Sequence, residues 1–225
     1  TISFTTMHHK EHIISPEFNE SFKATLVVPK GVDTDALGTF SGDINRDPDI
    51  KAVLRKKAEM GMVATDLDLG LASEGSFCGH PSAEMVDCNI ETILFVDKKK
   101  GIEIVANEIS TYSRAYYGSF EKDKDIESFL TSINFGKQGI LVKPHSSYIE
   151  SDGYIFKGIQ TIQSLNDAIS RIRKMFGTQS VWIETDNRAH FSPRRRETIR
   201  KACVKLIQHL HSLCPLCRSP GFSLV

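Results

Sequence analysis

Residues 73–77, Ser-Glu-Gly-Ser-Phe, place one carboxylate, Glu74, between the hydroxyls of Ser73 and Ser76. Carboxylate and hydroxyl oxygens are the ligands that hard divalent cations such as Mg²⁺ prefer. An apolar approach predicts a strand over residues 67–72, so we expect Glu74 just past a strand end, where α/β proteins commonly bind ligands. The alternative is a capped turn in which Glu74 accepts hydrogen bonds from backbone amides.

A second polar segment, residues 33–46, combines acids, small hydroxyls, two glycines and an arginine. Glycines allow a backbone to approach an anion, and a helix predicted from Asp47-Pro48 would point its positive end at this loop. The segment supplies Asp33, Asp35 and Asp43 as expected metal ligands, and Thr39, Ser41 and Arg46 as expected substrate contacts. A polar turn with side-chain-to-backbone hydrogen bonds is the alternative.

The segment His8-His9-Lys10-Glu11 follows the first predicted strand. His9 could transfer protons near neutral pH, and Lys10 could contact a phosphate. A charged turn is the alternative.

A fourth cluster lies in residues 184–196. Side chains alternate along a strand, so Glu184 and Asp186 share a face. Asp186 is an expected metal ligand, Arg188 an expected anion contact and His190 an expected proton carrier. A solvated loop leading into a helix cap is the alternative.

Cys214 and Cys217 form the single closely spaced cysteine pair among five cysteines. Two thiolates at this spacing suit zinc, but a structural zinc site needs four ligands. His209 and His211 are two residues apart on a predicted helix and point in different directions. A zinc half-site, free thiols and a redox pair therefore all stay open. The cysteines show no disulfide pattern, which favours a reducing, cytoplasmic location.

These segments require strands and helices that position them. Runs of β-type residues predict strands at 2–6, 24–29, 36–40, 67–72, 91–96, 102–109, 139–143, 154–156 and 180–184. Helical spacing of apolar residues predicts helices from 48 to 62 and over 125–132, 161–176 and 193–213. Interleaved strands and helices indicate an α/β fold with a mixed sheet covered by helices. We expect one domain over 1–213 and a short zinc-knuckle-like tail over 214–225.

Charge and hydropathy exclude some classes of protein. The chain has 28 Lys and Arg against 28 Asp and Glu, so its formal net charge is zero. Neutral charge argues against a generic nucleic-acid or anionic-membrane binder, despite the short basic run Arg194–Arg196. No apolar run approaches the ~20 residues that span a bilayer. A small phosphate-containing molecule is the expected partner.

Taken together, the segments resemble an uncharacterised bacterial protein family. Its blocks read HxKE, GTFSG(D/E)IxR, SEGSFGPHP, DMRAHxNPxR and CPxC, and they match residues 9–11, 38–46, 73–81, 186–194 and 214–217. The chain departs from the blocks at Cys78-Gly79, at Asn187 and at Phe191-Ser192. The family pattern continues into a second CxxC, which would complete a zinc ribbon. The resemblance implies no activity.

A second resemblance is to the house-cleaning nucleoside triphosphate pyrophosphatases. It implies that Glu74 is a metal-binding acid, that Lys56 or Lys57 contacts phosphate, and that residues 8–10 form an N-terminal phosphate contact. Ser73 stands where that family has a second acid.

Two functions follow as hypotheses. The first is a Mg²⁺-dependent hydrolase of a phosphate ester or anhydride, with Glu74 as its key acid and Lys10, Arg46, Lys57 and Arg188 around the anion. It predicts that Glu74→Ala abolishes turnover and leaves the melting temperature nearly unchanged. The second is a non-catalytic protein that binds a small anion or a partner, which predicts stabilisation by the ligand without turnover.

Overall fold

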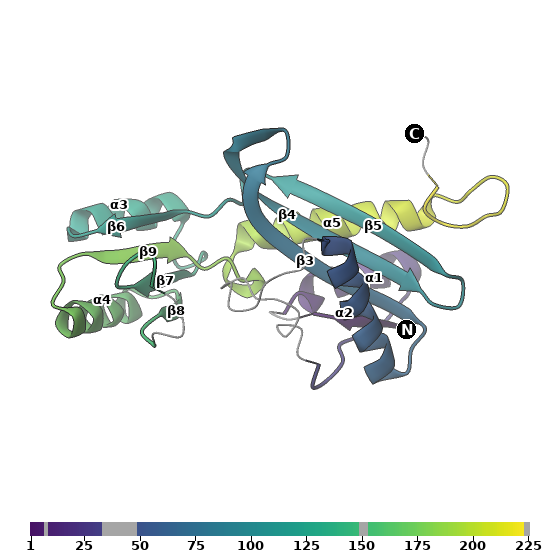
Figure 1. Cartoon of the computed structure of the whole chain (residues 1–225), viewed down its shortest axis with the longest axis horizontal. Coiled ribbons are helices and arrows are strands. Elements are labelled where there is room, and N and C mark those ends of the chain that lie inside the picture. Colours follow the sequence, from purple (N-terminus) through teal and green to yellow (C-terminus); the bar gives the residue numbers. More distant parts are fainter. Residues whose placement is uncertain (7–8, 33–48, 149–152, 223–225) are drawn as a thin grey trace. The chain divides into compact units, whose positions relative to one another are not determined.

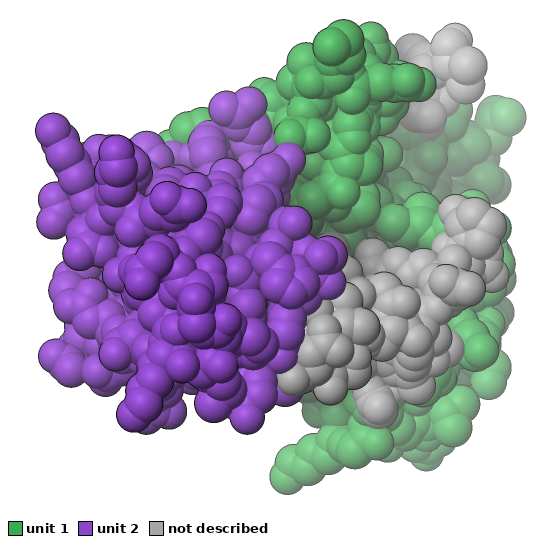
Figure 2. All heavy atoms as spheres, turned by 60° about the vertical axis from the view of Figure 1, so that its left-hand side comes forward, with its two compact units in different colours: residues 1–113, 196–225 green, residues 114–195 purple. Residues whose placement is uncertain are grey.

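The structure is a computed structural model that describes residues 1–6, 9–32, 49–148 and 153–222. The chain divides into two compact units, which Figure 2 shows in different colours. Unit 1 consists of residues 1–113 and 196–225, and unit 2 consists of residues 114–195. Each unit has its own sheet and is described by itself.

The sheet of unit 1 is mixed and has the strand order β2-β1-β3-β4-β5 (Figure 1). Its strands are β1 (Ile2–Thr5), β2 (Leu26–Val27), β3 (Leu69–His80), β4 (Ala83–Asp97) and β5 (Ile102–Ser110). β1 is parallel to β2 and β3, whereas β3, β4 and β5 form an antiparallel meander. β4 and β5 confirm the predicted hairpin around residues 97–101.

Helix α2 (Ile50–Thr65) covers one face of this sheet. Asp49 caps it, because its carboxylate accepts hydrogen bonds from the backbone amides of Lys51 and Ala52 at 2.9 and 3.2 Å. The cap is therefore Asp49, two residues after the predicted cap Asp47. Its buried stripe packs on alternate residues of β3 and β4, and the cluster comprises Leu54, Ala58, Met62, Ala72, Leu94 and Val96.

Helices α1 (Glu11–Phe22) and α5 (Pro193–His211) lie on the other face (Figure 1). Arg200 of α5 pairs with Glu17 of α1 at 3.4 Å, and Lys205 of α5 pairs with Glu108 of β5 at 2.6 Å. The core on this side includes Phe4, Ile14, Phe18, Leu71, Ile93, Ile199, Cys203 and Leu206, all fully buried. α5 starts within unit 2 and continues as part of unit 1.

Unit 2 is a four-stranded antiparallel sheet with helices on one face. Its elements are β6 (Tyr117–Phe120), α3 (Asp123–Ile133), β7 (Ile140–Lys143), β8 (Phe156–Ile159), α4 (Ile162–Phe176), β9 (Val181–Thr185) and the short 3₁₀ helix η3 (Ala189–Phe191). The strand order is β6-β9-β7-β8. Val181 and Ile183 of β9 are buried in one cluster with both α3 and α4, so Trp182 and Glu184 lie on the face that these helices leave open.

The predicted fold class, an α/β fold with a mixed sheet covered by helices, is confirmed by the sheet of unit 1. The described residues form two sheets, with unit 2 inserted between β5 and most of α5. The single domain expected over residues 1–213 stays a prediction, which an unfolding experiment below addresses. The strand expected over residues 36–40 lies outside the described residues.

Candidate functional site

Strand β3 runs through the Ser73–Phe77 motif, so the prediction that Glu74 lies just past a strand end is wrong. β3 pairs with β4 over its whole length, with Ser73 opposite Ile93, Glu74 opposite Thr92 and Gly75 opposite Glu91. The strand continues past its apolar part because the polar side chains that follow are buried with partners.

Glu74 points to the face of the sheet that α2 covers. Its Oε2 lies 2.6 Å from Nζ of Lys57, which projects from α2, and the two side chains are only 8% and 7% exposed. A buried charge is stable only when it is paired, so each side chain depends on the other. Ser76 shares this face and is half-buried, with its Oγ 4.0 Å from Sγ of Cys78.

Ser73 points to the opposite face, towards the start of α1. Nζ of Lys10 donates a hydrogen bond to Ser73 Oγ at 3.2 Å and lies 3.9 Å from Oε2 of Glu91. Asn89 donates from Nδ2 to the other oxygen of Glu91 at 2.9 Å. All four side chains are buried. Successive strand residues thus anchor one lysine on each face of the sheet, and Lys10 and Lys57 do not converge on one ligand.

The start of α1 carries a group of three side chains that suit a metal ion. A ligand atom of each of His9, Glu11 and His12 lies within 4.8 Å of the others. Oε1 of Glu11 is 3.4 Å from Nδ1 of His9 and 3.6 Å from Nε2 of His12, and the two rings stack with centroids 5.7 Å apart. The imidazoles are 66% and 77% exposed, so water reaches this group.

Sequence reasoning expected His9 to carry protons and missed the metal group. The signal was the His-x-Glu-His spacing of residues 9–12, which the left-handed turn at His9 and the first residues of α1 bring together. No helix was predicted here, because Pro16 lies inside α1 and the first residues of the helix are polar.

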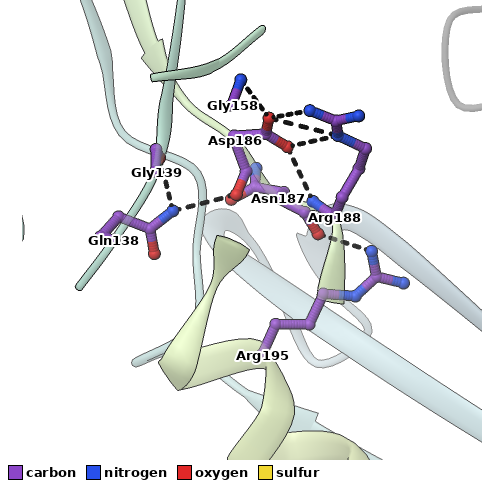
Figure 3. A network of polar contacts seen from close by, with 7 residues as sticks. All are labelled: Gln138, Gly139, Gly158, Asp186, Asn187, Arg188 and Arg195. Carbon is purple, nitrogen blue, oxygen red and sulfur yellow. Dashed lines mark hydrogen bonds and ion pairs between the residues drawn. The ribbon is translucent and has the colours of Figure 1, made fainter. Parts of the chain in front are cut away.

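In unit 2, Asp186 is held by a local network (Figure 3). Its Oδ1 accepts hydrogen bonds from Nε of Arg188 at 2.9 Å and from the Arg188 backbone at 3.1 Å. Its Oδ2 accepts from Nη2 of Arg188 at 2.6 Å and from the Gly158 amide at 3.0 Å. The Asp186 side chain is 3% exposed. Both carboxylate oxygens are therefore occupied: they fix the conformation of the loop after β9, and the Gly158 contact ties that loop to β8.

The rest of this loop is fixed in the same way. Gln138 donates to the carbonyl oxygens of Gly139 and Asp186 at 2.8 and 3.0 Å, and Arg195 donates to the Asn187 carbonyl at 2.6 Å. The Arg188 guanidinium also lies 4.7 Å from the centre of the Phe191 ring, against which His190 packs. Asp186 and Arg188 contact each other, whereas His190 packs on Phe191; the roles expected of Asp186, Arg188 and His190 stay predictions.

The turn that carries Cys214 and Cys217 is well defined. Arg218 adopts a left-handed φ of 61°, and its amide donates to the Cys214 carbonyl at 2.9 Å. Hydrogen bonds from the hydroxyl and amide of Ser219, together with one from Cys214, lower the pKa of the Cys217 thiol. This environment favours the thiolate, which is the form that binds metals or reacts.

The two histidines weighed as partners of these cysteines are engaged elsewhere. His211 Nε2 lies 2.6 Å from Ser21 Oγ, its ring stacks on Phe22, and His209 Nδ1 lies 3.3 Å from the Val105 carbonyl oxygen. Within the described ranges, no group of three metal ligands includes either cysteine. The zinc-knuckle tail stays a prediction.

The structure therefore brings together some of the expected site residues. Glu74 meets Lys57, Lys10 meets Ser73, and Asp186 meets Arg188. Glu74 belongs to unit 1, whereas Asp186, Arg188 and His190 belong to unit 2. The expected ligands and contacts Asp33, Asp35, Thr39, Ser41, Asp43 and Arg46 lie outside the described residues.

The model of a domain of unknown function, DUF6671, matches residues 57–225, and the chain belongs to this family. The match includes the Glu74 strand, the Asp186 loop and the CxxC turn, whereas the His9 group precedes it. No curated protein and no solved structure matches the chain. The resemblance to the pyrophosphatases stays a prediction. Across the part of the chain that the structure describes, every helix is too short or too polar to cross a bilayer.

Proposed function

We propose that the chain is a divalent-metal-dependent hydrolase of a phosphate ester or anhydride, with His9, Glu11 and His12 as the metal ligands. The observation that carries the proposal is the mutual proximity of their three ligand atoms, within 4.8 Å, on an exposed helix start. Catalytic metal sites typically combine three protein ligands with a position open to water or substrate. Two imidazoles and one carboxylate favour Zn²⁺ or another transition metal over Mg²⁺.

The surroundings of this group suit an anionic substrate. It lies at the positive end of the α1 dipole, and anions are stabilised near the start of a helix. Lys10, between the metal ligands in sequence, ties this turn to Ser73 and Glu91 in the sheet. In this proposal Lys10 is a positioning residue, while Glu74 with Lys57 and Asp186 with Arg188 maintain the fold. When bound, the metal would neutralise phosphate oxygens and acidify a water molecule.

Cobalt binding tests the metal site independently of activity. The untagged full chain is titrated with Co²⁺ and followed by absorption, which separates thiolate coordination from coordination by nitrogen and oxygen. We expect His12→Ala to weaken the nitrogen-oxygen site by more than about tenfold. His80→Ala, which removes another imidazole, serves as the matched control, and the double change Cys214→Ser, Cys217→Ser removes the thiolate signal of the CxxC turn. Equal Co²⁺ affinity in wild type and His12→Ala would overturn the assignment of the ligands.

Phosphate release tests the activity. The chain loaded with Zn²⁺, Mn²⁺ or Co²⁺ is assayed on nucleoside triphosphates, pyrophosphate and a phosphodiester. We expect turnover that falls by at least about 100-fold in His12→Ala and is unchanged in His80→Ala. Turnover that survives His12→Ala, or that is absent with every metal, would contradict the hydrolase.

A non-catalytic ligand-binding protein is the second candidate. It is favoured by the burial of Glu74 against Lys57, since the carboxylate expected to act on substrate instead joins a helix to a strand. Pyrophosphate that raises the melting temperature of the metal-loaded chain without being hydrolysed would support this candidate.

A further inference from the structure

A cavity of about 430 Å³ lies in unit 2, at one end of the sheet face that α3 and α4 leave open. It is lined by Trp182 and Phe176, by His145, and by the hydroxyl side chains of Ser119, Thr178 and Ser180. Its volume is in the range of small-molecule sites, about 300–1,000 Å³. None of the residues discussed so far as metal ligands takes part in it.

The Trp182 ring is held in a fixed orientation. Its indole N–H donates to Oε2 of Glu184 at 2.6 Å, and that carboxylate oxygen lies 3.5 Å from Nζ of Lys143. Tyr117 on the neighbouring strand stacks on Trp182 with centroids 5.4 Å apart and planes 22° apart. The ring is thus oriented before any ligand arrives, which reduces the entropy lost on binding.

Phe176, the last residue of α4, is exposed although it is a large apolar ring. It is 41% exposed. Tyr148 and Tyr154 meet it edge-on, with centroids 5.7 and 5.8 Å away. Two braced aromatic rings around one cavity provide surfaces on which a flat ligand can stack.

The polar part of the lining offers hydrogen bonds without charge. The Ser119 and Ser180 hydroxyls lie 2.6 Å apart, so one of them donates a hydrogen bond to the other. The second hydroxyl proton and the remaining lone pairs are available to a ligand that has both donors and acceptors on its edge. The described lining residues include no Lys, Arg, Asp or Glu. This composition favours a neutral ligand over a phosphorylated one.

We propose that this cavity binds a neutral, planar heteroaromatic ring, namely a nucleobase presented as a free base or nucleoside. A nucleobase combines two π faces with an edge of mixed donors and acceptors, which matches the rings and hydroxyls of the lining. The site is independent of the proposed hydrolase, since it uses different residues in the other unit.

Trp182 is the only tryptophan of the chain, so its fluorescence reports on this site alone. The full chain is titrated with adenosine, guanosine, cytidine and uridine and with the free bases, and glucose is included as a ligand that stacks without being aromatic. We expect saturable quenching by at least one base or nucleoside, and none by glucose. Saturation by glucose alone, or no saturation up to millimolar concentrations of any nucleoside or base, would overturn the proposal.

Variants distinguish binding in the cavity from non-specific stacking on the partly buried Trp182 ring. Phe176→Ala and Phe176→Leu are each expected to weaken binding about tenfold, since both remove the second ring. Ser180→Ala is expected to weaken it about fivefold, because one hydrogen bond is lost. Met175→Ala, which changes the exposed neighbour of Phe176, is the matched control and should change affinity less than twofold. Circular dichroism confirms that each variant is folded, and unchanged affinity in both Phe176 variants would contradict the site.

Discussion

The buried ion pairs of the two units are built differently. In unit 1, Lys57 and Glu74 come from a helix and a strand, and Lys10 reaches Ser73, 63 residues along the chain. These contacts join residues that are far apart in the sequence. In unit 2, Asp186 pairs with Arg188 two residues away and accepts two further hydrogen bonds from backbone amides.

The difference indicates what each network does. The unit 2 network shapes one loop, and the central carboxylate, Asp186, accepts hydrogen bonds from two backbone amides as well as from the Arg188 side chain. The unit 1 pairs join separate elements to both faces of one sheet, so loss of one partner leaves a charge inside the core. We therefore expect the two networks to respond differently to truncation.

The largest effect is expected for Glu74→Ala, which leaves the Lys57 ammonium buried without its carboxylate. Breaking a buried pair in this way destabilises a protein by about 3–5 kcal/mol. Thermal and urea unfolding measure the loss. This reverses the expectation from sequence that the melting temperature would hardly change.

Two variants check the explanation. Glu59→Ala removes an exposed carboxylate from the same helix and should stay within about 0.5 kcal/mol of wild type. The double variant Lys57→Met, Glu74→Leu removes both charges and should be more stable than Glu74→Ala alone. If the double variant is equally unstable, lost packing rather than the unpaired charge explains the result.

Asp186→Ala is expected to have a smaller effect, about 2–3 kcal/mol. The amides of Gly158 and Arg188 lose their acceptor, but the Arg188 side chain is 33% exposed and can be hydrated. Hydrogen exchange should show the lost protection in β8 and β9, with α2 and β3 unaffected. Asp167→Ala, at an exposed position of α4, is the control, and protection lost equally throughout the chain would contradict a local network.

Two probes, one in each unit, can then test whether the units unfold together. All five cysteines lie in unit 1 and the single tryptophan lies in unit 2. In Glu74→Ala, we expect the urea midpoint for labelling of the buried Cys203 to fall by about 1 M, and that of Trp182 fluorescence to fall less. Equal shifts of both midpoints would instead support the single domain expected over residues 1–213.

The smallest effect on stability is expected for Cys217→Ser, which changes an exposed turn. The same turn should nevertheless react first with iodoacetamide, because hydrogen bonds lower the Cys217 pKa. Burial raises the pKa of Cys203 to about 12, so at pH 8 about one in ten thousand of its thiols is ionised. Mass spectrometry of the native chain over time should find Cys217 modified early and Cys203 last, and the reverse order would contradict both environments.

Much of the fold could be predicted because apolar residues follow regular spacing. Helix α4 begins after the Thr161 cap and ends at Phe176, as expected, and the β4–β5 hairpin brackets its predicted turn. Strand β3 was expected to end near Ala72, because the buried residues beyond it are polar and their burial depends on distant partners. β6 was missed because its sequence, Tyr-Gly-Ser-Phe, contains a glycine and no β-branched residue, and none of its residues is buried.

The candidate site was harder to predict for a similar reason. Asp186 and Arg188 could be grouped because they are close in sequence. The contact between Lys10 and Ser73 depends on how α1 meets the sheet, which no local pattern contains. The His9 group became visible only once α1 was known to begin at Glu11.

The order of elements along the chain affects how the protein is made. The sheet of unit 1 is complete by Ser110, but most of α5, which covers one of its faces, follows unit 2. During synthesis on a ribosome, Phe4, Leu71 and Ile93 therefore lack the cover of α5 until the whole of unit 2 has emerged. Unit 2 is continuous in sequence and can fold during that interval. A nascent chain paused before α5 would consequently be a natural client for a chaperone that shields apolar surfaces.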